Sequence, residues 1–320
     1  MVRVCVLGAT GFLGGHIARA AYDAGWQVVA VRRRPGFCGS IGDLGVAWRE
    51  AELGDTAALR AAMSGCGVIF HAAGFYPQRR CRVDKAVEEA AQQIQHVLRC
   101  AREAGVERLI YTSSLSTVAQ RYTPGMAALD ERSHYRPGSL HNAYYEAKWA
   151  MERIALECRV PEVVALLPTA AFGPGDVKPT TGVVIREAGR GHIPVYFDAV
   201  INAVDGRDVA AAHIAAVARG RAGERYIIGG HNLSLRELLE TVDRCQGCRR
   251  RRLRLPRGLI ATIARAADRL PFLPLHDHIR AFEYWTPLCS QKAATELGHR
   301  PRPFEETVRD TLRWFGLPMH

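Results

Sequence analysis

The sequence predicts an α/β protein built on a doubly wound parallel sheet, followed by a smaller and mostly helical lobe. Over the first half of the chain, short runs of β-branched and aliphatic residues alternate with segments of helical periodicity. The runs are almost continuously apolar, which is typical of strands covered by helices on both faces. A glycine-rich turn follows the first run, and together with the alternation it indicates a Rossmann-type fold.

Each element of this pattern follows from a short stretch of sequence. Strands are expected at residues 2–7, 27–32, 67–71, 106–112, 163–167 and 224–228. Helices are expected at residues 12–24, 55–63, 83–103 and 142–158. Asp55 or Thr56 is the expected cap of the second helix, and Gly105 closes the third. Pro and Gly interrupt residues 168–194, and only helices are expected from residue 234 onward.

The composition is that of a globular protein with a large core. The chain has 320 residues, of which 48% are hydrophobic and 23% are charged. It contains no run of about 18 apolar residues, and its first residues lead directly into a strand, so we expect a cytoplasmic protein. The nine cysteines are scattered and odd in number, which favours reduced thiols over a disulfide framework.

The net charge of +11 favours partners that carry negative charge. Its densest part is the arginine cluster, residues 249–257, which we interpret as a solvated basic face. No aromatic residues alternate with these arginines to stack on bases, so no nucleic acid partner is expected. Neither the pair Cys245 and Cys248 nor the pair His276 and His278 has further ligands at suitable spacing, and we expect no metal site.

The turn after the first strand has the pattern of a phosphate-binding site. Gly8 permits a tight turn, Gly11 lets the backbone approach a ligand, and Gly14 allows the next helix to pack closely on the strand. The first amides of that helix point towards an anion, and the helix dipole adds partial positive charge. We therefore expect a dinucleotide here, with contacts from Gly8, Thr10, Gly11, Phe12, Leu13 and Gly14.

The end of the second strand indicates which dinucleotide binds. A carboxylate there accepts hydrogen bonds from the adenosine ribose of NAD, whereas an arginine accommodates the 2′-phosphate of NADP. The strand ends in Arg32, Arg33 and Arg34, and no carboxylate follows in the sequence before Asp43. NADP(H) is therefore the preferred cofactor, with Arg32 as its first contact and Arg33 as the second, and NAD(H) is the alternative.

These features divide the chain into two parts. Residues 1–167 form the expected dinucleotide-binding domain, and residues 168–320 form the expected substrate-binding lobe. Within the lobe, residues 200–228 are expected to return to the main sheet.

Tyr144 and Lys148 form the candidate reacting pair. On a helix they lie one turn apart on the same face, so the ammonium can lower the pKa of the phenol towards the range of a general base. Ser113 and Ser114 follow the strand at 106–112, at the carboxyl edge of the sheet, where open α/β sheets bind ligands. Taken alone, the pair could be a solvated helix face, and the serines could be turn formers.

Five segments occur in order along the chain: GATGFLG near the start, HAAG at 71–74, YTSS at 111–114, Tyr144 with Lys148, and LLPTAAFGPGD at 166–176. Together they resemble the extended short-chain dehydrogenase/reductase family, also called the NAD-dependent epimerase/dehydratase family. The segments at 173–182, 201–213 and 223–235 are similar to its branch of hopanoid-associated sugar epimerases and steroid-dehydrogenase-like proteins.

The resemblance implies a role for each matching position. Tyr144 is the acid/base, and Lys148 lowers its pKa and binds the nicotinamide ribose. Ser114 polarises the reacting oxygen, or Ser113 does so if the register differs by one. Further implied cofactor contacts are Glu52, Leu53, Ala72, Ala73, Gly74, Thr112, Ser113, Pro168 and Thr169. The candidate substrate contacts are Phe75, Ala119, Phe172, Asp176 and Lys178.

The chain departs from the family pattern at four places. Leu7 replaces a threonine before the first glycine, and Glu52 stands where an aspartate usually contacts the adenine. Ala90 occupies the usual position of an asparagine that serves the proton relay, so another donor or a water must substitute. Residues 115–120 lack the Tyr-Gly of nucleotide-sugar epimerases, which weakens the case for a sugar-nucleotide substrate.

Three functions remain open at this point. We expect an NADP-dependent oxidoreductase that interconverts an alcohol and a ketone on a bulky, apolar molecule of steroid or triterpenoid type. The alternative is an NAD-dependent sugar or sugar-nucleotide epimerase or dehydratase that retains its cofactor. The third is a non-catalytic NADP-binding regulator, and the joint presence of Ser114, Tyr144 and Lys148 argues against it.

The expected partners are a small, lipid-like substrate and a second copy of the chain. The resemblance implies a homodimer through the helices 83–103 and 142–158. The apolar segment 258–274 follows the arginine cluster, and the two could dock on an anionic membrane and admit a lipid. A core helix over the substrate lobe is the simpler interpretation of that segment.

Overall fold

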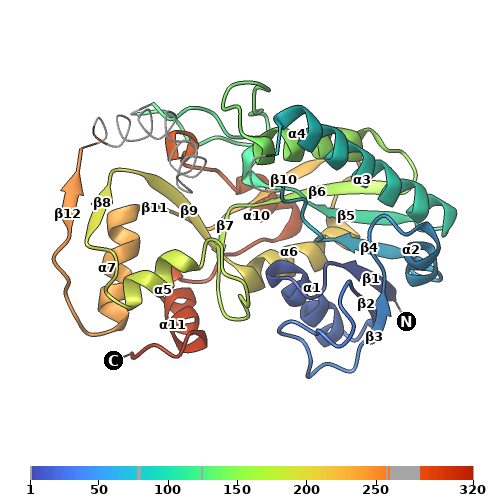
Figure 1. The fold of residues 1–320 in the computed structure, drawn as a ribbon, viewed down its shortest axis with the longest axis horizontal. Coiled ribbons are helices and arrows are strands. Elements are labelled where there is room, and N and C mark those ends of the chain that lie inside the picture. The colour runs from blue at the N-terminus through green and yellow to red at the C-terminus, as the bar shows by residue number, and fades with distance from the viewer. Residues whose placement is uncertain (1, 78–80, 124, 257–258, 260–281, 320) are drawn as a thin grey trace.

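A seven-stranded parallel sheet forms the centre of the computed structural model, which describes residues 2–77, 81–123, 125–256, 259 and 282–319 (Figure 1). The strand order is β10-β6-β5-β4-β1-β2-β3. The strands are β1 (Arg3–Leu7), β2 (Gln27–Arg32), β3 (Ala47–Glu50), β4 (Val68–His71), β5 (Arg108–Thr112), β6 (Glu162–Pro168) and β10 (Arg225–Ile228). The order reverses between β1 and β4, which confirms the predicted doubly wound α/β class.

Helices cover both faces of this sheet. α1 (Phe12–Asp23) and α6 (Gly206–Arg219) pack on one face, and α2 (Thr56–Met63), α3 (Val83–Glu103) and α4 (Ala143–Glu157) pack on the other (Figure 1). Each layer has its own buried core, and β1 contributes to both because its side chains alternate between the two faces. A continuously apolar strand is therefore what this position in the sheet requires.

Local side chains explain where several helices begin and end. The Asp55 carboxylate caps the N-terminus of α2, as one of the two expected caps. The Asn142 side chain caps α4 by accepting from the N–H groups of Tyr144 and Tyr145 in its first turn. Gly105 has a φ of +73°, a left-handed conformation that favours glycine, and it stops α3 just past Glu103.

Most of the remaining elements form a lobe beside the main sheet (Figure 1). A three-stranded sheet has the order β11-β9-β7, and a two-stranded sheet pairs β12 with β8. Its strands are β7 (Ala170–Phe172), β8 (Val195–Phe197), β9 (Val200–Asp205), β11 (His231–Ser234) and β12 (Leu253–Leu255). The helices of the lobe are α5 (Val183–Gly189), α7 (Leu235–Cys245) and α11 (Phe304–Trp314). In contrast, α10 (Gln291–Leu297) packs against α6 and β10, and the 3-10 turn η1 (Leu115–Thr117) packs against α4 and β6. A second 3-10 turn, η2, spans Phe282–Tyr284.

Six strands lie where the sequence predicts none: β3, β7, β8, β9, β11 and β12. β3 is an edge strand of mixed polarity, and only one of its four side chains is partly buried, so it lacks the apolar run of a central strand. β12 contradicts the expectation of helices alone after residue 234, because its three residues pair in parallel with β8. A strand of three residues is too short to show a period of two.

Residues 200–228 meet the main sheet in part. α6 packs against α1, and β10 adds the edge strand beside β6. β9, in contrast, pairs with β7 and β11 in the lobe. The division of the chain at residue 168 stays a prediction.

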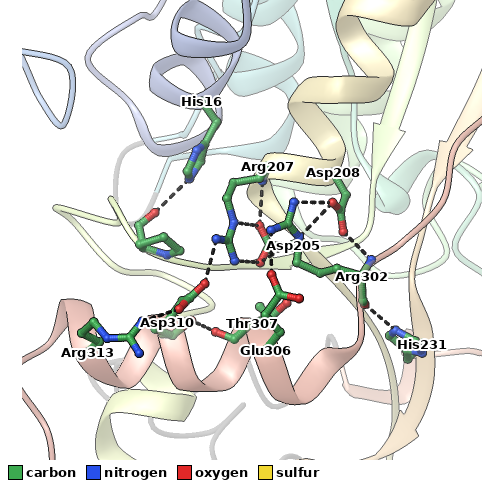
Figure 2. A network of polar contacts seen from close by, with 12 residues as sticks. His16, Asp205, Arg207, Asp208, His231, Arg302, Glu306, Thr307, Asp310 and Arg313 are labelled. Atoms are coloured by element: carbon green, nitrogen blue, oxygen red, sulfur yellow. Dashed lines mark hydrogen bonds and ion pairs between the residues drawn. The ribbon is translucent and has the colours of Figure 1, made fainter. Parts of the chain in front are cut away.

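A network of buried ion pairs joins α6 to α11 at the base of the lobe (Figure 2). Asp205 caps α6 and binds Arg207, whose guanidinium also reaches Asp310 on α11 at 2.7 Å. Arg302, just before α11, binds Asp208 in the first turn of α6 at 2.8 Å. Asp205 is fully buried, so these charges depend on one another for compensation.

Carboxylates neutralise part of the arginine cluster. Arg250 and Arg252 both bind the buried Asp243 on α7, at 2.8 and 2.7 Å. Arg254 pairs with Asp198, whereas Arg249 and Arg251 are exposed. The basic face is thus smaller than the sequence suggests, because part of the cluster fastens the segment after α7 onto the lobe.

Several expectations fall on other parts of the chain. The described residues do not include Arg257 or the pair His276 and His278. Of the apolar segment 258–274 they include only Leu259. No helix of the described ranges has the length and apolar character needed to cross a membrane. In the same ranges, no three His, Cys, Asp or Glu side chains gather as they would around a metal ion. All nine cysteines are free.

Candidate active site

The glycine turn between β1 and α1 leaves no room for side chains. Gly8 has a φ of +83°, and a Cβ there would lie 2.7 Å from the backbone nitrogen of Ala73. A Cβ on Gly14 would lie 2.1 Å from the carbonyl oxygen of Gly8, so the helix packs directly on the turn. The turn is therefore held between α1 and the loop after β4.

The first turn of α1 presents unused amides. Gly11 is the cap residue, and no side chain caps this end of the helix. The first helical hydrogen bond runs from Gly15 to Gly11, so the N–H groups of Phe12, Leu13 and Gly14 have no acceptor within the helix. Such a helix end, without acidic residues in its first turn, fits the phosphates of a dinucleotide.

The loop after β2 closes over this turn. A Cβ on Gly39 would lie 2.6 Å from the carbonyl oxygen of Thr10, so the two loops touch through their backbones. On the other side, His16 Nε2 contacts the Pro174 carbonyl at 2.9 Å, which ties the loop after β7 to α1. Predicted cofactor and substrate segments thus meet around the start of α1.

Arg32 at the end of β2 already has an anionic partner. Its Nη2 binds Glu50 Oε1 at 3.0 Å, its Nη1 contacts the Cys38 sulfur, and its guanidinium lies 5.2 Å from the centre of the Trp48 ring. Glu50 is the last residue of β3, the strand that the sequence analysis missed. A neighbouring strand thus supplies Arg32 with a carboxylate, although none follows the arginines in the sequence before Asp43.

The other predicted adenosine contacts lie around the same edge. Glu52 and Leu53 follow β3 directly, with Glu52 exposed and Leu53 packed against the core under α2. Ala72, Ala73 and Gly74 follow β4, and the Ala72 N–H donates to the Leu7 carbonyl. Pro168 ends β6, and the hydroxyl of Thr169 beside it is buried without a partner among the described residues.

The structure brings Tyr144, Ser114 and Lys148 together at the carboxyl ends of β5 and β6. The Tyr144 hydroxyl donates to Ser114 Oγ at 3.3 Å. Lys148 is buried one turn further along α4, and its Nζ donates to the Thr112 carbonyl at 3.4 Å. Because Asn142 caps α4, Tyr144 falls in the first turn, next to the end of β5.

The electrostatics of this site differ from the expectation in one respect. Burial raises the pKa of Tyr144 above its ordinary value, and the hydrogen bond to Ser114 opposes this only in part. Burial also lowers the pKa of Lys148 to about 8, opposed by the negative charge of Glu152. These side chains therefore do not produce the expected lowering of the Tyr144 pKa, because the loss of water around the phenol dominates it.

A buried carboxylate supports the serines from behind. Glu152, one turn after Lys148, accepts hydrogen bonds from the hydroxyls of Ser113 and Thr117. Arg225, which begins β10, binds Glu152 at 2.9 Å and also donates to Thr117. The sequence analysis missed both charged residues, because they are far apart in the chain.

Two more buried groups lie close to Lys148. The ring of His71, the last residue of β4, is buried with both nitrogens unpartnered among the described residues. Burial, followed by the charge of Lys148, lowers the pKa of His71 to about 3, so the ring is neutral. The Tyr111 hydroxyl beside it also lacks a described partner, while Ala90 lies fully buried in the core under α3.

His213 is a third residue that the sequence analysis missed, and it orients the end of β5, where the Thr112 carbonyl accepts from Lys148. His213 on α6 is fully buried, and burial lowers its pKa to about 4. Its Nδ1 donates to the Val209 carbonyl, so Nε2 is left to accept from the Thr112 hydroxyl at 2.9 Å. The end of β5 is thereby fixed from the opposite face of the sheet.

Aromatic rings flank the reacting phenol. Tyr76 is 68% exposed, and its ring stacks on that of Tyr144 with 5.5 Å between centres. A Cβ on Gly74 would lie 2.8 Å from the Tyr76 ring, so the ring lies against the loop after β4. Tyr145 and Tyr284 continue the cluster behind Tyr144. The sequence analysis named the neighbouring Phe75 and overlooked Tyr76.

The predicted substrate contacts are only partly gathered. Ala119 is buried in the same cluster as Tyr145, and Phe75 packs against the core under α3. Asp176 is buried after β7, whereas Lys178 is exposed over the Phe37 ring. Phe172 is fully buried in the lobe core against Phe304, so the structure does not bring it to this surface.

Cavities elsewhere do not compete with this site. Two cavities, of about 490 and 370 Å³, are lined by none of the predicted site residues. The larger lies beside β10, and the charges around it pair with one another, as Lys292 does with Glu224 and Asp130 with Arg132. The chemistry therefore gathers between the glycine turn and Tyr144.

Known proteins share both the sequence pattern and the fold. A family model described as the NAD dependent epimerase/dehydratase family matches residues 4–229. The chain is 29% identical to a protein provisionally named dihydroflavonol 4-reductase from Synechocystis, over 97% of this chain and 93% of that one. It is 28% identical to sterol demethylase protein B from Methylococcus capsulatus, over 97% of each. The solved structure of a nucleoside-diphosphate-sugar epimerase from Pseudomonas aeruginosa has a TM-score of 0.82 at 28% identity and covers 98% of this chain and 97% of its own.

Proposed function

Because the chain belongs to the NAD-dependent epimerase/dehydratase family, and is thus an oxidoreductase-type enzyme of the extended short-chain dehydrogenase/reductase kind, we propose that it interconverts an alcohol and a ketone with NADP(H). The proposed substrate is bulky and apolar, of steroid or triterpenoid type. The observation that carries the proposal is the contact between the hydroxyls of Tyr144 and Ser114, next to the buried ammonium of Lys148.

The hydrogen bonds of Ser114 suit it to hold a substrate oxygen. Its Oγ accepts from the Tyr144 hydroxyl and from the Ser116 N–H, which uses both lone pairs. The proton of Ser114 is then left to donate to a third group. A carbonyl oxygen can accept this proton from Ser114, and it can also accept the proton of Tyr144 once that proton turns away from Ser114 Oγ. Its carbon is then polarised and positioned for reduction.

Tyr144 then acts as the acid in reduction and as the base in oxidation. When the phenol gives its proton to the substrate oxygen, the phenolate needs a nearby cation because water is largely excluded. Lys148, with a pKa of about 8, is mainly protonated at neutral pH and supplies that charge. The dinucleotide, when bound, supplies or accepts the hydride.

The aromatic surface around Tyr144 supports an apolar substrate. Tyr76 offers an exposed ring stacked on the reacting phenol, and a flat hydrocarbon skeleton can lie against such a face. Two relatives are named for polycyclic molecules, one for a dihydroflavonol and one for a sterol. Asp176 and Lys178 remain proposed substrate contacts.

A sugar-nucleotide epimerase is the second candidate. It is favoured by the likeness to the nucleoside-diphosphate-sugar epimerase over nearly the whole of both chains. It is also favoured by Glu50, because a carboxylate at the adenosine ribose suits NAD. Such an enzyme keeps its cofactor, whereas the proposed reductase exchanges it at each turnover.

The proposal extends to assembly and location. The proposed homodimer surface is the exposed sides of α3 and α4. The proposed compartment is the cytoplasm, where the protein also contacts an anionic membrane peripherally. Light scattering on the purified protein gives the mass in solution, and a monomer would remove the dimer from the proposal.

One preparation distinguishes the two candidates. The purified protein is analysed for retained nucleotide, and NADPH oxidation with a 3-oxosteroid is compared with epimerisation of UDP-glucose. Exchangeable NADPH and loss of its absorbance with the steroid support the reductase. Tightly retained NAD⁺ and a change of the sugar would replace it by the epimerase.

Tyr144→Phe tests the catalytic assignment. Removal of the hydroxyl is expected to reduce turnover at least about a thousandfold, because proton transfer and half of the substrate clamp are lost together. NADPH affinity, measured by quenching of its fluorescence, should stay within about twofold. Tyr145→Phe is the matched control, since its ring packs behind Tyr144 in the core. Equal activity of the two variants would remove the acid/base role from Tyr144.

A further inference from the structure

The structure assigns to Glu50 a role in choosing the dinucleotide: we propose that its carboxylate competes with a 2′-phosphate for Arg32, so that it opposes NADPH and favours NADH. This inference deepens the proposed function and rests on it. Arg32 and Glu50 are direct partners in the register of β2 and β3, each the last residue of its strand. The side chains therefore leave the sheet together at its carboxyl edge, on the side of the glycine turn.

The guanidinium of Arg32 is held in place but incompletely satisfied. It stacks over Trp48, donates to Glu50 and contacts the Cys38 sulfur. Its Nε is buried and has no partner among the described residues. Arginine presents five donors in a planar fork that matches a phosphate, so a phosphate can take the place of Glu50 on a guanidinium that is already oriented.

Glu50 is free to change partners. Its side chain is 49% exposed, against 17% for Arg32, so the carboxylate faces solvent while the guanidinium is packed. A phosphate dianion at Arg32 would lie beside this carboxylate and repel it. An unphosphorylated ribose instead offers two hydroxyls, and a carboxylate can accept hydrogen bonds from them. The same pair of residues therefore favours NADH while Glu50 stays in place, and NADPH once it moves away.

The neighbouring charges set the balance between the two outcomes. Arg33 and Arg34 are exposed just after Arg32, and their field attracts a phosphate to this edge. Glu50 cancels the charge of Arg32 on the strand beside it. NADPH binding in the wild type thus depends on the displacement of one carboxylate, and removal of its charge should strengthen that binding.

Glu50→Gln tests this directly, because glutamine keeps the size and a hydrogen bond to Arg32 while it loses the charge. We expect the dissociation constant for NADPH to fall about tenfold, which corresponds to ~1.4 kcal/mol. The constant for NADH should stay unchanged or rise. Both are measured by fluorescence titration of the full chain. Thermal melting of the variant checks that the fold is kept.

Asp43→Asn is the matched control. Asp43 also pairs with an arginine, Arg19 on α1, so this variant makes the same change in net charge. It should leave the ratio of the NADH and NADPH constants unchanged. An equal ratio in Glu50→Gln and Asp43→Asn would overturn the role of Glu50.

The titrations also separate this inference from the proposed function. If the wild type binds NADPH and Glu50→Gln does not change the preference, the inference fails and the oxidoreductase remains. If the wild type binds neither dinucleotide, both fail. Arg32→Met completes the set, since it should weaken NADPH at least about tenfold and NADH much less. Equal losses for both dinucleotides would contradict a phosphate contact at this edge.

Discussion

The reacting residues are held in place by side chains that are distant from them in the sequence. The reacting residues are Tyr144, Ser114 and Lys148. Tyr144 and Lys148 could be predicted because both lie on one helix at a spacing of one turn, and Ser114 because it follows a strand. Glu152 and Arg225, which hold the end of β5 from behind, could not, because their pairing depends on how β10 joins the sheet. Local patterns thus indicated the reacting groups, and tertiary contacts determine their electrostatics.

Asp176 illustrates how a candidate site residue can lower stability. It is only 6% exposed, and burial raises its pKa from 3.8 to about 6, opposed by Arg186. Below pH 4 the carboxyl group keeps its proton in both states. Between pH 4 and 6 the unfolded chain releases the proton while the folded chain holds it, so the folded state loses relative stability as the pH rises, and above 6 the loss is complete.

Asp176→Asn should therefore stabilise the protein at pH 7.5 by about 2 kcal/mol and have little effect at pH 4. Urea unfolding at the two pH values measures the difference. Asp43→Asn should behave in the opposite way, because the hydrogen bond from Arg19 lowers the pKa of that carboxyl. A gain from Asp176→Asn that is the same at both pH values would show that its charge is not the cause.

The elements that could be predicted are those with a strong pattern of their own. Six strands of the main sheet and the helices α1 to α4 occur close to their expected bounds, because each has an apolar run or a cap that needs no distant partner. β3 has no such run, since an edge strand exposes most of its side chains, and its existence depends on pairing with β2. Missing β3 also hid Glu50, so the carboxylate that pairs with Arg32 could not be predicted.

Asn142 is the point at which one element controls the chemistry. Its side chain accepts from the N–H groups of Tyr144 and Tyr145, and so decides where α4 begins. Asn142→Ala should reduce stability by about 1 kcal/mol, the usual cost of a lost cap. It should also lower turnover at least about fivefold with little change in NADPH affinity, because Tyr144 lies in the turn that frays.

Denaturant unfolding and steady-state rates measure these two effects of Asn142→Ala separately. Asn142→Asp supplies the control, because aspartate is an equally good cap at a helix N-terminus. Its stability and turnover should both be near those of the wild type. A loss of stability in Asn142→Ala without any loss of turnover would mean that the first turn of α4 is held in place by its packing instead.

The molecule as a whole depends on how its lobe is attached to the sheet. The predicted substrate contacts after residue 168 can meet Tyr144 only if the lobe keeps its orientation, and the ion network of Figure 2 provides a direct connection. Arg302 binds the Asp208 side chain through both Nε and Nη2, and its backbone N–H binds the same carboxylate. This ion pair could not be predicted from the sequence, because Asp208 and Arg302 are far apart in the chain and meet only in the folded protein.

Arg302→Met should therefore weaken the whole molecule more than a surface substitution does. It leaves the buried Asp208 without its cation, which costs about 3 kcal/mol in comparable buried pairs. Arg309→Met is the matched control, because Arg309 forms an exposed pair with Glu305 on the same helix and should cost less than about 0.5 kcal/mol. If the network couples the lobe to the sheet, urea unfolding of Arg302→Met followed by tryptophan fluorescence and by circular dichroism should no longer coincide, because the lobe unfolds first. The contrary result is that the two unfolding curves coincide and that the free energy of unfolding falls no more than in Arg309→Met. The apolar contacts between lobe and sheet would then couple the two parts, and the charges of Figure 2 would stabilise only α6 and α11.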